Sequence, residues 1–250
     1  QRLGYNKGAG IGFLVTNDQA AKTLTTLNAS AIFSYHLPVT RKFAIRVGFQ
    51  ATYFQKSLDW NKLTFGDMID PRRGFVYNTN DVPNGNGKKT GIDFSGGILG
   101  FSETFFFGFA AHHVTEPNES LVLGDSPLPM KLTGHAGAVI PLGKSRYRKK
   151  TDVKISPNIL YRNQGTFQQL NLGVYVNKGP IWTGVWYRNG DAFIVLLGIQ
   201  TDLVRLGYSY DVTTNQLTLR TAGSHEVSFA MNFKCKPPKK RYRTISCPSF

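Results

Sequence analysis

The chain has 250 residues, of which 41% are hydrophobic and 13% aromatic, and its 30 lysines and arginines against 15 aspartates and glutamates give a net charge of +15. No apolar run approaches the roughly 18 residues that a membrane-spanning helix requires, so this chain would have to cross a bilayer as a set of paired strands. The basic residues lie mostly at segment ends and in the C-terminal stretch rather than on one face, which argues against nucleic acid as a partner.

The first part of the chain alternates apolar with polar or small residues, which predicts strands over residues 8–16 and 26–37. The clearest repeat follows these strands and is about ten residues long, the length that a tilted membrane strand needs. Strands of soluble sandwiches more often stop at about five or six residues. The apolar positions of this repeat are Phe43, Ile45, Val47, Phe49, Ala51 and Tyr53.

Two long connections interrupt the strands, at about residues 57–90 and 115–129. A connection of this length without regular structure is usually functional or mobile. The first connection contains a closely spaced group of charged residues, which we take as a candidate functional loop: Asp67, Asp70, Arg72 and Arg73.

Further strands follow in the second part of the chain. They are predicted at residues 91–101, 104–113, 132–140, 153–161, 170–176, 181–188, 192–200, 204–212 and 226–233, with Pro157 indicating a bulge or an irregular strand. About twelve strands, linked by tight turns and longer loops, predict an all-β fold with residues 1–233 as one antiparallel transmembrane β-barrel of the outer membrane. A soluble β-sandwich that binds a ligand is the alternative, because it too needs one apolar and one polar face per strand.

The sequence lacks the constellations expected of an enzyme. It contains no Gly-x-Ser-x-Gly elbow, no His-Glu-x-x-His helix and no cysteine and histidine spacing suited to zinc. His112 and His113 are adjacent, and on a strand they are predicted to point to opposite faces and not to share a metal. We therefore expect no catalytic residue, no metal and no cofactor.

Six spaced segments stand out in the sequence: residues 65–75 (FGDMIDPRRGF), 93–97 (DFSGG), 113–118 (HVTEPN), 207–211 (GYSYD), 223–228 (GSHEVS) and 247–250 (CPSF). Taken in order, these segments resemble the PorP/SprF family. Members of that family are outer-membrane β-barrels of the type IX secretion system, which exports cargo that includes adhesins for gliding motility and attaches some of it to the cell surface. Family members usually have a further N-terminal pair of strands, so the resemblance implies about fourteen strands if such a pair precedes this chain.

The resemblance implies a non-enzymatic protein of the cell outer membrane. Its partners would be outer-membrane lipid, type IX secretion components in the periplasm and outer membrane, and secreted cargo with a C-terminal sorting domain, with no role for nucleic acid. A passive outer-membrane channel or a lipid transporter is the alternative within the same architecture.

A basic tail follows the last strand, over residues 234–250. The resemblance implies that this tail lies in the periplasm, where its prolines keep it extended and its charge favours an acidic surface. Both cysteines of the chain, Cys235 and Cys247, are in the tail, so a bridge that holds the fold is not expected. The candidate partner-binding residues are Lys234, Lys236, Lys239, Lys240, Arg241, Arg243, Cys247 and Phe250.

Overall fold

One large antiparallel sheet makes up most of the computed structural model, which describes residues 2–3, 8–80, 87–121, 124–142, 153–214 and 223–233. Neighbouring strands follow the order of the chain, and β10 continues β9 along β11. The strands are β1 (Arg2–Leu3), β2 (Gly8–Ala20), β3 (Leu24–Pro38), β4 (Phe43–Leu58), β7 (Lys88–Ser102), β8 (Phe105–His112), β9 (Lys131–Ala138), β10 (Ile140–Leu142), β11 (Val153–Gln164), β12 (Phe167–Lys178), β13 (Ile181–Arg188), β14 (Ala192–Gln200), β15 (Val204–Thr213) and β16 (Ser224–Met231).

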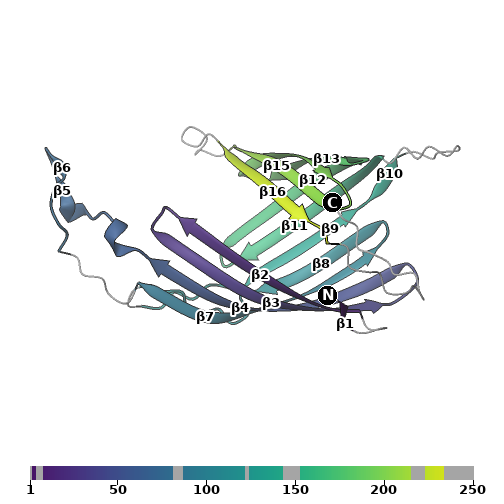
Figure 1. The fold of residues 1–250 in the computed structure, drawn as a ribbon, viewed down its shortest axis with the longest axis horizontal. Helices are drawn as coiled ribbons and strands as arrows, with labels where there is room; N and C mark the ends of the chain where they lie inside the picture. The colour runs from purple at the N-terminus through teal and green to yellow at the C-terminus, as the bar shows by residue number, and fades with distance from the viewer. Residues whose placement is uncertain are drawn as a thin grey trace.

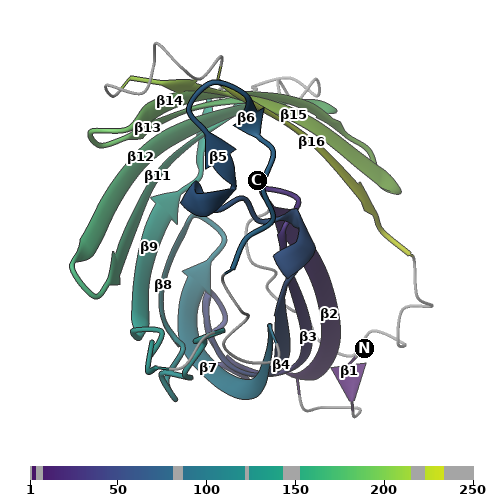
Figure 2. The ribbon, with the colours of Figure 1, turned by 90° about the vertical axis from the view of Figure 1, so that its left-hand side faces the viewer.

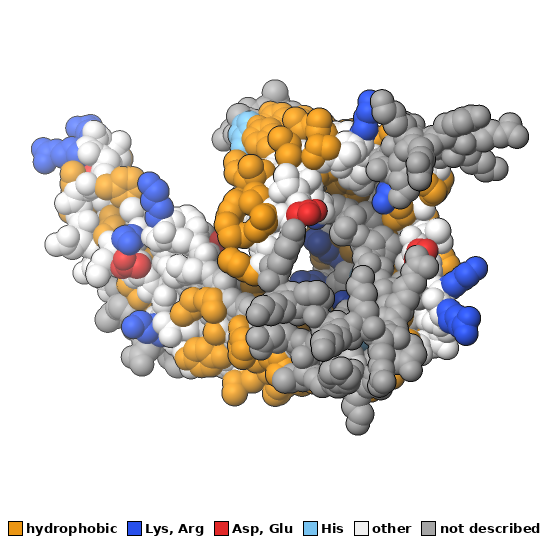
Figure 3. Space-filling view, turned by 45° about the vertical axis from the view of Figure 1, so that its right-hand side comes forward, with side chains coloured by type: hydrophobic (Ala, Val, Ile, Leu, Met, Phe, Trp, Pro, Cys, Tyr) orange, Lys and Arg blue, Asp and Glu red, His pale blue; other side chains and the backbone are white. Residues whose placement is uncertain are grey.

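The sheet curls round on itself, as the wall of a barrel does (Figures 1 and 2), and the space-filling view shows a hollow inside it (Figure 3). In the described part of the chain β16 is paired only with β15, and β1 and β2 form the opposite edge, so the sheet is curved but not closed. The all-β, barrel-type fold predicted from the sequence is confirmed. No helix among the described residues is long and apolar enough to span a membrane.

The two faces of the sheet differ in polarity. On the outer face large apolar side chains are exposed, among them Phe49 at 51% and Phe229 at 62%. Polar side chains such as Ser30 and Asp93 point to the inner face, where they are buried. Figure 3 shows hydrophobic side chains gathered on the outside, with Lys and Arg side chains inside the hollow. A sandwich would need a second sheet over the apolar face, and the other sheet in the described residues is the two-stranded pair β5–β6.

Glycines opposite large rings tie neighbouring strands together on the inner face. Trp186 faces Gly173 across β12 and β13, and Trp182 faces Gly198 across β13 and β14. A Cβ atom at either glycine would overlap the indole ring of its partner. The rings fill space that a side chain would otherwise occupy, which packs the wall without a conventional core.

The strand pairing breaks where Pro157 lies, as the sequence indicated. The ladder between β9 and β11 runs to the pair Gly137–Asn158, and pairing resumes between β10 and β11 at Ile140–Ile155. Proline has no N–H to donate, and the chain separates into β9 and β10 at this point.

Two long connections leave the same end of the sheet, because they follow β4 and β8, which run in the same direction. The first contains regular structure that the sequence did not predict: the 3₁₀ turns η1 (Trp60–Lys62) and η2 (Gly66–Met68), and a small hairpin of β5 (Ile69–Asp70) and β6 (Gly74–Phe75). We call residues 59–80 the arm. The arm projects away from the sheet (Figure 1).

Candidate functional site

Asp93 anchors a polar cluster on the inner face of the sheet. It lies at an inward-facing position of β7 and is 5% exposed. Its Oδ2 atom lies 2.8 Å from Nδ1 of His113, and its Oδ1 atom accepts a hydrogen bond of 3.1 Å from the Thr115 hydroxyl. Because a buried carboxylate is costly without partners, these contacts hold the residues after β8 against the wall.

A second contact ties the same segment to β4. The Lys56 ammonium lies 2.6 Å from Oε2 of Glu119, with the two side chains 23% and 20% exposed. We call residues 113–130 the inner segment. It reaches from β4 on one side to the end of β11 on the other, where the Gln164 amide donates to the carbonyl of Pro129. It also folds on itself, since Asn118 bridges to Pro127 and donates to Asp125.

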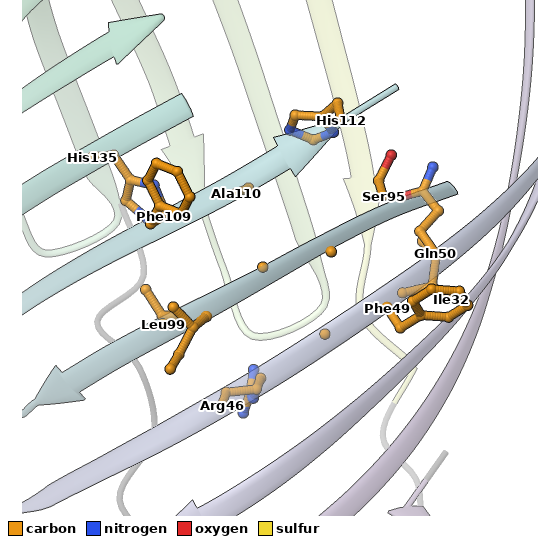
Figure 4. A pocket seen from close by; sticks show the side chains of 14 residues that line it. Ile32, Arg46, Phe49, Gln50, Ser95, Leu99, Phe109, Ala110, His112 and His135 are labelled. Carbon is orange, nitrogen blue, oxygen red and sulfur yellow. The ribbon is translucent and has the colours of Figure 1, made fainter. Parts of the chain in front are cut away.

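Two cavities of about 250 Å³ each lie beside this cluster. The first is mainly apolar and is lined by residues of β3, β4, β7, β8 and β9, including Arg46, His112 and His135 (Figure 4). The second is polar and lies between the inner segment and the wall, where its lining includes the hydrogen-bonded group Ser30, Thr52 and Gln50, together with Asp93, His112, His113, Glu119 and Lys131.

The prediction that His112 and His113 point to opposite faces was wrong, since both line the polar cavity. His113 lies just beyond the end of β8 and has a φ of 56°, in the left-handed region, so strand alternation no longer applies to it. Among the described residues no group of three His, Cys, Asp or Glu side chains is arranged to hold a metal ion.

The four residues of the candidate functional loop lie together on the arm. Oδ1 of Asp70 accepts hydrogen bonds from the N–H groups of Arg72 and Arg73, and Oδ2 accepts one from the Tyr77 hydroxyl. These bonds hold the pKa of Asp70 below its usual value of 3.8. Asp67 accepts from the Thr79 hydroxyl and the N–H of Asn80. The carboxylates therefore fix the hairpin.

The arm also exposes apolar side chains beside its two arginines. Phe75 is 62% exposed, Val76 53% and Tyr77 57%. Arg72 and Arg73 are exposed, and no hydrogen bond or ion pair joins either guanidinium to another described residue. The arm thus offers an apolar and basic surface at the end of the sheet from which it projects.

Sequence reasoning missed the contacts that hold the inner segment. Two features of the sequence could have pointed to these contacts. Asp93 is a carboxylate at an inward position of an alternating strand, and the segments that contain Asp93 and His113 are among those that resemble the family. The residues proposed for partner binding in the tail, Lys234, Lys236, Lys239, Lys240, Arg241, Arg243, Cys247 and Phe250, lie outside the described residues.

Comparison with known proteins gives one family. A family model described as "Type IX secretion system membrane protein PorP/SprF" matches residues 1–231. No curated protein sequence matches the chain significantly, and no solved structure does.

Proposed function

The chain belongs to the PorP/SprF family of type IX secretion system membrane proteins, and we propose that it is a non-enzymatic, multi-pass β-barrel of the outer membrane. In this role it supports the secretion or surface attachment of cargo proteins, such as gliding adhesins with a C-terminal sorting domain, and contacts periplasmic components of the system. The observation that carries the proposal is the exposed apolar outer face of the sheet, which includes Phe13 at 82% and Phe49 at 51%.

Lipid is the partner that this outer face fits. A soluble monomer rarely exposes so large a contiguous apolar surface to water. In a membrane barrel, the lipid-facing residues are apolar and alternate along each strand with polar residues that face inwards. Residues 1–233 would form the barrel in the membrane, and residues 234–250 would form the tail.

The orientation follows from the lengths of the connections. Outer-membrane barrels have short periplasmic turns and longer extracellular loops. The arm and the inner segment both follow strands that end at the same side, so that side would face outwards. The arm, with Asp67 and Asp70 fixing its hairpin and Arg72 and Arg73 displayed, would contact cargo or an outer-membrane component there. The tail would contact a periplasmic partner.

Gentle detergent extraction followed by identification of co-purifying proteins tests the assignment to the secretion system. Deletion of residues 234–250 should reduce recovery of a periplasmic component while the barrel still inserts, and Arg72→Ala with Arg73→Ala should leave that recovery unchanged. An unchanged recovery after the tail deletion rejects the role of the tail. Material that stays monodisperse in buffer without detergent rejects the membrane barrel itself.

A further inference from the structure

The inner face carries more basic than acidic side chains, and several of its arginines and lysines have a partner. Lys56 pairs with Glu119, and Arg188 lies 3.0 Å from Asp191 and 3.2 Å from Asp211. Two further guanidinium groups lie over aromatic rings, Arg46 at 5.5 Å from the Phe101 centroid and Arg205 at 4.8 Å from that of Trp182. These contacts compensate the positive charges of Lys56, Arg188, Arg46 and Arg205.

Lys131 on β9 and Arg162 on β11 differ from these residues. Among the described residues neither side chain has a hydrogen bond or an ion pair. The strand register places Lys131 opposite Gln164 and Arg162 opposite Thr133, so the two cations are diagonal neighbours across the β9–β11 ladder, a spacing of about 7–8 Å that long side chains can bridge. Like charges this close repel each other. No carboxylate among the described residues forms an ion pair with either cation to offset this repulsion.

Two histidines extend this basic group. His112 on β8 is directly opposite Lys131, and His135 lies four residues along β9 on the same face. His112 lines both cavities, Lys131 lines the polar one and His135 the apolar one. Space is therefore available next to Lys131 and the two histidines on the inner face of the wall, and Figure 4 shows where His112 and His135 lie along the apolar cavity.

The nearby carboxylates do not neutralise the basic group, because other contacts occupy them. Asp93 is bound by His113 and Thr115, and Glu119 is bound by Lys56. Oε1 of Glu116 accepts the N–H of Met130. None of these carboxylates forms an ion pair with Lys131 or Arg162, so both cations remain without a carboxylate partner among the described residues.

We propose that the inner wall of β8, β9 and β11 binds a phosphate group, held by Lys131 and Arg162 with His112 beside them. Two cations with several N–H donors match an anion that carries several oxygen acceptors and more than one negative charge. The phosphate belongs either to a free anion or to a phosphorylated lipid headgroup. The site lies in the lumen of the proposed barrel, and its binding chemistry is the same in the open sheet.

Titration calorimetry of the full chain in a non-ionic detergent, with inorganic phosphate at low salt, tests this site. Lys131→Ala and Arg162→Ala should each weaken phosphate binding by about tenfold, because each removes a charge-assisted hydrogen bond. Lys154→Ala is the matched control, because Lys154 lies on β11, on the same face as Arg162 and eight residues from it. This variant should bind phosphate as tightly as the unaltered chain does. Arg162→Lys should retain part of the affinity.

A second titration with micelles that contain a diphosphorylated glycolipid distinguishes the two sources. If the glycolipid binds and inorganic phosphate displaces it, the ligand is a phosphorylated headgroup. If inorganic phosphate binds and the glycolipid does not, the ligand is a free anion. The proposal is overturned if the unaltered chain binds neither probe, or if Lys154→Ala weakens binding as much as Lys131→Ala does. If an alanine variant does not elute at the volume of the unaltered chain in size-exclusion chromatography, it is misfolded, and Lys131→Gln or Arg162→Gln takes its place. If the unaltered chain does not insert into lipid vesicles, the proposed membrane barrel is rejected. Phosphate binding measured in detergent would still support the phosphate site.

Discussion

Lys56 and Glu119 are 63 residues apart in the chain, yet their charged groups lie 2.6 Å apart on the inner face of the sheet. Neither side chain is more than a quarter exposed, so solvent screens their attraction less than it would on an open surface. This ion pair, the contacts of Asp93 and a hydrogen bond of 3.0 Å from the Val114 N–H to the Phe94 carbonyl hold the inner segment against the strands that precede it.

Reversal of one charge should release the inner segment. Lys56→Glu places two carboxylates together and should cost about 1–2 kcal/mol of the local stability of the segment, seen as faster limited proteolysis between residues 113 and 130. The double variant Lys56→Glu with Glu119→Lys should restore the original protection. Equal cleavage of the single and double variants would show that the pair does not hold the segment.

Removal of the Asp93 charge should destabilise the fold more than removal of an exposed one. Asp93→Asn weakens the contacts to His113 and Thr115 and leaves a buried amide, so we expect a loss of about 1–3 kcal/mol, measured as a lower midpoint of thermal unfolding in detergent. Asp59→Asn is the control, because the Asp59 side chain is 40% exposed on the arm and lies 3.0 Å from the Lys62 ammonium. Similar midpoints for the two variants would contradict the role of Asp93.

Adjacent positions of β4 should respond differently to a charge. Phe49 points outwards and is 51% exposed, and an arginine there should cost about 2–4 kcal/mol near the middle of a bilayer. Gln50 points inwards and lines both cavities, so Gln50→Arg should be tolerated. Urea titration of the chain folded into lipid vesicles measures the difference, and a larger loss for Gln50→Arg would reverse the assignment of the two faces.

Acid should loosen the hairpin of the arm. The N–H groups of Arg72 and Arg73 and the Tyr77 hydroxyl hold the pKa of Asp70 below 3.8. A carboxylate whose pKa is lower in the folded state stabilises that state above its unfolded value, and this stabilisation is lost as the pH falls through the lowered pKa. Hydrogen exchange at the amides of Arg72 and Arg73 should therefore be slow at neutral pH, relative to the unfolded chain, and lose this protection only below about pH 4. In Asp70→Asn the amide oxygen can still accept these hydrogen bonds but carries no charge, so the protection should be weaker and should not change as the pH falls below about 4.

Period-two alternation is sufficient to predict the strands and to separate the outer from the inner face. In β4, for example, the alternation from Phe43 to Tyr53 indicates both the strand and its apolar side. Such a local pattern holds no information about side chains that meet across the hollow, so the pairing of Lys56 with Glu119 was missed. The two histidines were placed wrongly because the left-handed conformation of His113 ends the alternation one residue after β8. In the first long connection, regular structure arises from hydrogen bonds of Asp70 that the residue spacing alone does not reveal.

A methyl group added to a glycine that faces a ring should disturb the wall. Gly173→Ala forces this group against the ring of Trp186, which we expect to cost about 1–3 kcal/mol of unfolding free energy. Gly134→Ala is the matched control, because no atom lies within 4 Å of the position its Cβ would take. The same urea titration in vesicles measures both variants, and equal losses would mean that the ring contact is unimportant.

The opposition of rings and glycines also discriminates against misaligned strands during assembly. If β13 slipped by two residues along β12, each side chain would keep its face, but Trp186 would then stand opposite Asn171 or Tyr175 instead of Gly173. Both of those residues fill the space that the indole needs, so polarity alone would permit the slipped alignment while the volume of the tryptophan rejects it. The same check operates between Phe54 and Gly91 and between Phe106 and Gly137, which fixes the stagger of the strands at several places around the wall.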